Sequence, residues 1–237
     1  MILKIKIIML LSVISIVSVG CGGPSAVMVK PDALKNIRTV AILEIKKPLQ
    51  RIMDMGSSTP WGAISAQNDM KEIQPRFDAI LKKEKFAFNL ALTQELHKAL
   101  RHAGYKTYAI KVERADAAKL LEDYSKFKSR KVDALLDVAV VSSGYVVENV
   151  ITSNFWRPEA RVFVRLVNAS DGTILYQDTM MYGYHNPFMS GVDIDAPEKF
   201  HFSAREDIFK AGNKVLVAGL KDASKKVAQQ ISKELKK

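Results

Sequence analysis

One cysteine and four histidines are all the thiol and imidazole groups that these 237 residues provide. A single cysteine excludes an intramolecular disulfide framework and any cysteine-rich zinc or iron–sulfur site, and four histidines leave little material for another metal centre. The 12 glycines and 8 prolines are too few for a collagenous or low-complexity chain. With 48% hydrophobic and 26% charged residues, the composition is that of a globular protein that can bury its own core without a cofactor.

Recognisable catalytic motifs are also lacking. The chain contains no Gly-x-Ser-x-Gly sequence and no phosphate-binding glycine loop. His97 and His102 are five positions apart on a predicted helix, so their side chains diverge. Asp193, Asp195 and Glu198 lack the glycine-spaced ligand pattern of a calcium loop. We therefore predict a protein that is not an enzyme and that has no metal and no cofactor.

The N-terminus has the organisation of a secretory signal peptide. Lys4 and Lys6 precede an apolar run from Ile7 to Val19, and no acidic residue interrupts either part. This run is shorter than the ~20 residues that a membrane-spanning helix needs. We therefore predict that residues 1–20 are removed on export.

The cysteine stands directly after this segment. Cys21 follows Ser18-Val19-Gly20, an arrangement that resembles the lipobox of bacterial lipoproteins. The resemblance implies that Cys21 becomes the first residue, with diacylglycerol (palmitate-like chains) on its sulfur and a fatty acid on its nitrogen. Gly22 at the next position implies the outer membrane by the sorting rule of enteric lipoproteins. The alternative is an ordinary secretory signal followed by an unmodified thiol, which would be a liability in an oxidising compartment.

The mature chain is basic. The formal net charge of +11 falls to +9 when Lys4 and Lys6 are removed with the signal peptide. A basic periplasmic protein is attracted to phospholipid headgroups and to the peptidoglycan network. Since most of the excess is lysine, and planar phosphate recognition favours arginine, we predict proximity to peptidoglycan and no binding of nucleic acid.

The rest of the chain predicts a tether and one domain. Residues 21–36 are short and turn-prone, which suits a lipidated tether, and residues 37–237 show no repeat and no later break in composition. Apolar residues recurring every three or four positions predict helices over Phe77–Ala103 and Ala117–Phe127, and a third that starts at the capping-box sequence Ser203–Glu206.

Extended apolar or alternating stretches predict the strands of a sheet. The most apolar of them, Asp133–Val141, is typical of a strand buried on both faces and is predicted at the sheet centre. Lys47–Pro75 and Asn186–Phe202 show no persistent period and are predicted to be irregular. The predicted strands are Thr39–Ile45, Tyr105–Val112, Asp133–Val141, Tyr145–Thr152, Ala160–Val167 and Thr173–Tyr184. The predicted fold class is a single α/β domain with a mixed β-sheet, a C-terminal β-hairpin region and three main flanking helices.

Three stretches carry a resemblance to a known group. Thr39–Leu43, Asp133–Val141 and above all Ala160–Thr179, which reads ARVFVRLVNASDGTILYQDT, resemble the periplasmic domain shared by the curli-secretion lipoprotein CsgG, the penicillin-binding-protein activator LpoB and the N-terminal domain of TolB. The resemblance implies a lipid-anchored, non-catalytic module of the cell envelope that docks to envelope machinery or associates with itself. The alternative that it also implies is a CsgG-like secretion channel subunit, whose membrane hairpin would be Tyr145–Arg161; both faces of that stretch mix polar and apolar residues, which favours a soluble hairpin.

Two segments are candidates for partner binding. Met53, Met55 and Trp61 place adaptable methionines and a tryptophan in a predicted surface loop, and Phe155-Trp156-Arg157 lies at a predicted hairpin tip. Such residues are enriched at protein interfaces, where an envelope protein or a second copy of the chain would bind. The alternative for both segments is that they fold back over the protein's own core.

Overall fold

The structure is a computed structural model, and it describes residues 24–29, 31–54, 60–128, 131–147, 155–184 and 190–236. Within these ranges the chain forms one mixed sheet of seven strands in the order β3-β1-β4-β5-β6-β7, with β2 paired to β4 beside β1. The strands are β1 Thr39–Leu43, β2 Gln50–Asp54, β3 Lys106–Ile110, β4 Ala134–Val147, β5 Trp156–Asn168, β6 Ile174–Tyr182 and β7 Val192–Ile194. The helices are α1 Pro31–Leu34, α2 Pro60–Lys83, α3 Phe88–His102, α4 Arg205–Lys210 and α5 Asn213–Glu234, with single 3₁₀ turns η1 Ser125–Phe127 and η2 Glu198–Phe200.

The predicted fold class is confirmed, and the sheet centre is where the sequence places it. β4 pairs in parallel with β1 and then with β2 along one side, and antiparallel with β5 along the other. It merges the strands predicted at Asp133–Val141 and Tyr145–Thr152, because a bulge between Val140 and Ser142 absorbs one residue without ending the ladder. Gly144 lies inside this strand, and a Cβ atom there would lie 1.6 Å from the carbonyl oxygen of Arg51 on β2.

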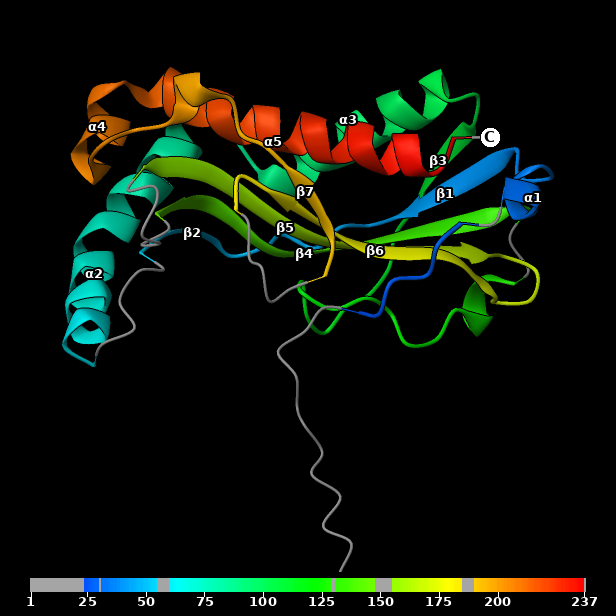
Figure 1. Cartoon of the computed structure of the whole chain (residues 1–237). Helices are drawn as coiled ribbons and strands as arrows, with labels where there is room; N and C mark the ends of the chain where they lie inside the picture. Colours follow the sequence, from blue (N-terminus) through cyan, green and yellow to red (C-terminus); the bar gives the residue numbers. More distant parts are fainter. Residues whose placement is uncertain are drawn as a thin grey trace, which may run out of the picture.

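Helices α3 and α5 cover one face of the sheet (Figure 1). Leu92, Leu96 and Leu100 of α3 recur at helical spacing and are fully buried, as are Leu216, Leu220, Val227 and Ile231 along α5. Helix α5 packs on β5 and β6, α3 packs on β3, and the two helices pack against each other, so that one continuous core lies between them and the sheet. Tyr145 of β4 extends from the sheet into this layer, where its hydroxyl donates to the carbonyl of Leu216 at 3.0 Å.

The prediction of an irregular stretch over Lys47–Pro75 is wrong. Residues 50–54 form β2, and α2 runs from Pro60 through Pro75 to Lys83. The helix docks on the outer edge of β2 through Gln74, whose side-chain amide accepts from the backbone N–H of Ile52 at 3.2 Å and donates to the carbonyl of Gln50 at 2.8 Å. The Gln74 side chain thereby makes hydrogen bonds that the backbone of a neighbouring strand would otherwise make. The hydrophobic periodicity of the sequence gives no sign of this contact. The helix predicted over Phe77–Ala103 is divided between α2 and α3, and Lys85 in the break has a φ of 50°.

The face of the sheet away from α3 and α5, which we call the second face, is covered in part by residues 111–128 (Figure 1). The helix predicted over Ala117–Phe127 is wrong, since only the 3₁₀ turn η1 forms there. Tyr124 and Phe127 instead bury their rings against the second face of the sheet. The apolar cluster there consists of Ala41, Leu43, Tyr124, Phe127, Leu135, Val167 and Ala169.

The two ends of the domain also differ from prediction. The capping box at Ser203–Glu206 does not form: α4 starts after Ala204 without a side-chain cap, and Gly212, with a φ of 93°, separates α4 from α5. The stretch predicted as irregular at Asn186–Phe202 contains β7 and η2. In the segment predicted as a tether, Val27 forms an antiparallel bridge with Gln177 at the edge of β6.

Candidate functional site

Met53 and Phe155-Trp156-Arg157, which belong to the two segments predicted to bind a partner, lie at the same end of the sheet. The structure does not show Trp61 with them, because α2 contacts β2 through Gln74, about 20 Å along the helix from Trp61. Met53 of β2 pairs with Val146 of β4, and Val146 pairs with Arg157 of β5, so that the two segments are separated by a single strand. The backbones of β2 and β5 therefore run roughly 10 Å apart here. Trp61 lies near the start of α2 beyond β2, while Met55 lies outside the described residues. Sequence separation hides this juxtaposition, which the pairing of β4 with both strands creates.

Phe155 and Trp156 have different surroundings, although they are neighbours in the sequence. The Phe155 side chain is 45% exposed and stacks on the ring of His201, with centroids 6.1 Å apart. Trp156 is only 8% exposed, and its backbone exchanges two hydrogen bonds with Phe202, at 2.8 and 2.9 Å. Trp156 and Arg157, predicted at a hairpin tip, lie inside β5, and Phe155 directly precedes the strand. Phe155 is thus the accessible member of the pair.

Arg157 lines a cavity of about 290 Å³ between the ends of β5, β6 and β7 and the turn η2. Asp193, Asp195 and His201 line the same cavity. Burial lowers the pKa of Arg157, against the opposing effect of the Asp195 carboxylate. His201 Nε2 lies 3.0 Å from the carbonyl oxygen of Ala196, so this ring nitrogen donates to the backbone. Asp193 and Asp195, which the sequence analysis considered as cation ligands, thus share the cavity with the guanidinium of Arg157. This guanidinium can balance their negative charge.

Glu159 is a buried carboxyl group that sequence analysis missed. It lies two residues after Arg157 on β5, is 6% exposed, and accepts a hydrogen bond from the Ser142 hydroxyl at 2.5 Å. Burial raises its pKa to about 7, and the bond from Ser142 and the charge of Arg161 oppose that shift. One glutamate between two arginines is an ordinary pattern for a solvated strand face, so no local feature of the sequence identifies it.

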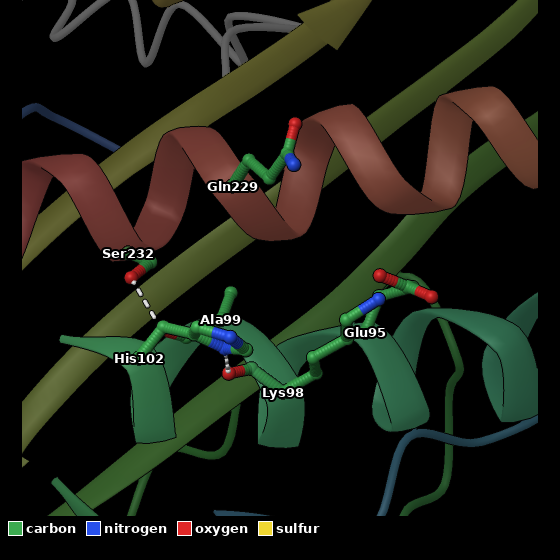
Figure 2. Close-up of a pocket in the computed structure, with 6 residues that line it drawn as sticks. All are labelled: Glu95, Lys98, Ala99, His102, Gln229 and Ser232. Atoms are coloured by element: carbon green, nitrogen blue, oxygen red, sulfur yellow. Dashed lines mark hydrogen bonds between the residues drawn. The ribbon is translucent and has the colours of Figure 1, made fainter. Parts of the chain in front are cut away.

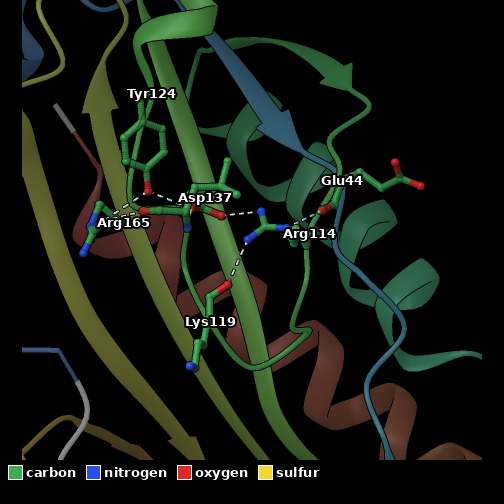
Figure 3. Close-up of polar contacts among 7 residues, drawn as sticks. Glu44, Arg114, Lys119, Tyr124, Asp137 and Arg165 are labelled. Carbon is green, nitrogen blue, oxygen red and sulfur yellow. Dashed lines mark hydrogen bonds and ion pairs between the residues drawn. The ribbon is translucent and has the colours of Figure 1, made fainter.

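A buried ion pair fixes the segment that crosses the second face (Figure 3). The guanidinium of Arg114 contacts the carboxylate of Asp137 on β4, and the two side chains are 2% and 0% exposed. The other carboxylate oxygen of Asp137 accepts from the backbone N–H of Leu121 at 2.7 Å and from the Tyr124 hydroxyl at 2.6 Å. These bonds hold residues 114–124 in a non-helical conformation, although the spacing of their apolar residues predicts a helix.

Arg114 and Arg165 tie this segment to the backbone as well as to the carboxylate. Arg114 donates to the carbonyls of Glu44, at 3.0 Å, and Lys119, at 3.2 Å. Arg165 of β5 donates to the carbonyl of Leu121 at 3.0 Å and to the Tyr124 hydroxyl at 3.2 Å. The polar side chains of this cluster bond to one another and to the backbone of residues 114–124. We call the cluster a structural lock because these bonds hold the segment on the sheet.

The helical layer carries a shallow groove between α3 and α5 (Figure 2). It encloses about 340 Å³, and its lining residues are Glu95, Lys98, Ala99, His102, Gln229 and Ser232. The Ser232 hydroxyl donates to the carbonyl of Ala99 at 3.0 Å, and His102 Nδ1 lies 2.7 Å from the carbonyl oxygen of Lys98. The serine and the histidine therefore bond to backbone rather than to each other, and no nucleophile–base pair is formed in this groove.

No group of three or more His, Cys, Asp or Glu side chains in the described part of the chain could hold a metal ion. Within the same ranges, no helix combines the length and the apolar character that crossing a membrane requires.

The hairpin that a secretion channel would insert is anchored in the domain at its base. Tyr145 is 1% exposed and bonds to α5, and Val147 pairs with Trp156 on the opposite strand. Residues 148–154 lie outside the described ranges. The described part of the hairpin thus packs on the protein's own helices and core.

Comparison with known proteins gives remote similarities. No family model and no curated protein matches the chain. Among solved structures, the PelC dodecamer from Paraburkholderia phytofirmans is 12% identical, with 90% of this chain and 95% of that one covered and a TM-score of 0.35. The lipoprotein GNA1162 from Neisseria meningitidis is 13% identical (63% and 88% covered, TM-score 0.30), and a putative neuraminyllactose-binding hemagglutinin homolog from Helicobacter pylori is 16% identical (91% and 92% covered, TM-score 0.33). At these values the similarities assign neither a family nor a function.

Proposed function

We propose that the protein is a lipid-anchored interaction or assembly module of the bacterial cell envelope, with its α/β domain in the periplasm at the outer membrane. It acts without catalysis, by docking to another envelope protein or to a second copy of itself. The observation that carries the proposal is the position of Cys21, the only cysteine, directly after a signal-peptide pattern and three residues before the described fold begins at Pro24.

The contacts of the first described residues support an anchoring role. The backbone of Val27 exchanges two hydrogen bonds with Gln177 on β6, at 2.7 and 3.0 Å, and the side-chain amide of Gln177 donates to the carbonyl of Ser25 at 2.6 Å. The chain is therefore held by the sheet four residues after the proposed lipid attachment site. A lipid on Cys21 would keep the whole domain at the membrane surface rather than at the end of a long tether.

Removing the lipid attachment site is expected to release the protein from membranes. Each buried methylene of an acyl chain contributes ~0.8 kcal/mol to membrane binding, so several chains make the anchor effectively permanent. In fractionated cells the natural protein should sediment with membranes after a high-salt wash, and Cys21→Ala should lose nearly all of that fraction. Ser25→Ala is the matched control, because only the backbone of Ser25 is used, and it should stay with membranes. An intact mass without acyl groups, or membrane retention of Cys21→Ala, would contradict the proposal.

Phe155 is the residue at the end of the sheet whose removal best tests partner binding. An exposed aromatic ring at an interface hot spot contributes enough that Phe155→Ala should reduce capture of the partner, or of a second copy, by about tenfold. The measurement is the yield of crosslinked complexes in intact cell envelopes. Leu90→Ala removes a side chain that is 62% exposed on α3 and should leave the yield unchanged. Trp156→Ala is a poorer test, since it would empty a buried site and lower the stability of the fold. Equal yields for the Phe155 and Leu90 variants would exclude this surface.

A further inference from the structure

Residues 24–29 and residues 111–128 lie on the same side of the sheet, opposite the layer formed by α3 and α5 (Figure 1). Gln177 bonds to Ser25 through a side chain that lies on the second face, where it also accepts from Arg165 Nε at 2.5 Å. Only three residue steps separate Cys21 from Pro24, and an extended chain spans about 10 Å in that number. A lipid on Cys21 therefore attaches close to the second face and far from the helical layer.

Exposed lysines lie on the segment that covers part of the second face. Lys126, Lys128 and Lys131, which we call the basic patch, are exposed at η1 and directly after it. No acidic residue lies between positions 124 and 132 of the sequence. The acids that flank the patch in the sequence are Glu122, Asp123 and Asp133, and Asp171, whose pKa is lowered chiefly by hydrogen bonds from Thr173, is close enough to Lys128 for that charge to lower it further. Asp123 accepts from the backbone and hydroxyl of Ser125, Asp133 from the backbone of Arg38 and Thr39, and Asp171 from the backbone of Thr173. The patch is thus a run of three exposed ammonium groups with no acid between them in the sequence, flanked by carboxylates on both sides.

The patch lies near the point at which the N-terminal segment joins the sheet. Lys128 contributes to the lowered pKa of Asp171, after the larger effects of the hydrogen bonds from Thr173. Asp171 precedes Gln177 by six positions, which correspond to about 20 Å along a strand. The Arg114–Asp137 ion pair holds the start of the segment that leads to Lys126 and Lys128. Met28, 70% exposed, adds an apolar side chain next to the anchor.

We infer that the mature protein rests on the bilayer with the second face of its sheet toward anionic phospholipid headgroups, the basic patch in contact with them and the α3–α5 layer directed away from the membrane. The inference rests on the proposed lipid anchor. Charge alone would favour the opposite orientation, because α5 displays Lys221, Lys225 and Lys226. The bonds that hold Ser25 and Val27 decide between the two, since they fix the side of the sheet from which the anchor emerges.

Lysine footprinting of the natural lipoprotein tests this orientation. The acylated protein is reconstituted in vesicles that contain phosphatidylglycerol, and the rate at which an amine reagent modifies each lysine is followed by mass spectrometry. Each lysine near an anionic surface gains about a fivefold preference for the bound position, so labelling of the basic patch should slow by about that factor relative to protein in detergent. Labelling of Lys221, Lys225 and Lys226 should not slow. Protection of the α5 lysines instead, or equal labelling of both sets, would overturn the inference.

Two triple variants with the same net charge separate a surface contact from a general charge effect. Lys126→Gln/Lys128→Gln/Lys131→Gln should abolish the protection of Lys119, an exposed lysine on the same segment, whereas Lys221→Gln/Lys225→Gln/Lys226→Gln should preserve it. Equal loss in both variants would overturn the inference, as would full protection on vesicles of phosphatidylcholine alone or displacement by free glycerol phosphate. Intact mass distinguishes the two levels of failure: an unmodified Cys21 refutes the proposed function, while an acylated protein without the protection pattern refutes only the orientation.

Discussion

Arg114→Met is expected to lower the free energy of unfolding by about 3–5 kcal/mol, because it leaves the Asp137 carboxylate buried without its charged partner. The carboxylate is completely buried, and only the N–H of Leu121 and the hydroxyl of Tyr124 would remain to stabilise its charge. The loss should extend beyond the pair, since Arg114 also binds the carbonyls of Glu44 and Lys119. Urea denaturation of the mature chain, followed by circular dichroism, measures the change.

Lys119→Met is the matched control for this variant. It introduces the same side chain on the same segment, but the ammonium group that it removes is exposed and only the carbonyl of Lys119 takes part in the cluster. Its effect should stay within about 0.5 kcal/mol, as is usual for surface substitutions. A loss below about 1 kcal/mol for Arg114→Met would show that Asp137 is neutral or solvated in the folded protein, and the description of the cluster as a structural lock would fail.

The cluster also shows why the helix predicted over Ala117–Phe127 does not form. Its apolar positions Ala117, Leu120, Leu121 and Tyr124 have helical spacing, and the prediction of a helix there follows from that spacing alone. The competing influence comes from a carboxylate 13 residues after Tyr124 and from a guanidinium ahead of the segment. Neither is visible in a local window. By contrast, β4 was predictable from its own residues. It is buried on both faces, and a strand of that kind has a continuous apolar run.

The candidate site was predictable as separate pieces and not as an arrangement. Methionine and aromatic composition identified Met53 and Phe155, but their proximity depends on the pairing of β2 and β5 with the same strand. The sequence places Trp156 and Phe155 in one motif, whereas in the structure Trp156, the first residue of β5, is packed and Phe155, which precedes the strand, is exposed. The lipid attachment at Cys21 remains a prediction of the sequence, because that residue lies outside the described ranges.

Glu159→Gln is expected to stabilise the protein increasingly as pH rises. The pKa of Glu159 is raised from 4.5 to about 7, chiefly by burial, so between these values the folded state holds a proton that the unfolded state has lost. The free energy of unfolding of the natural protein therefore falls as pH rises through this window, and the penalty is complete above about pH 7. A shift of that size corresponds to about 3 kcal/mol. Glutamine keeps an oxygen that can accept from Ser142 and has no proton to lose.

The pH dependence separates this effect from a general gain in packing. The stability difference between Glu159→Gln and the natural protein should be near zero below pH 4.5 and should reach about 3 kcal/mol by pH 8, as urea denaturation at several pH values would show. Asp171→Asn is the control: hydrogen bonds from Thr173 lower the pKa of that exposed carboxyl, so its contribution changes only in more acidic solution and the difference should be flat above pH 5. A flat difference for Glu159→Gln as well would mean that the carboxylate is ionised in the folded protein at no cost. Arg157 and Arg161, which flank Glu159 on the same face of β5, would then have to compensate its burial fully.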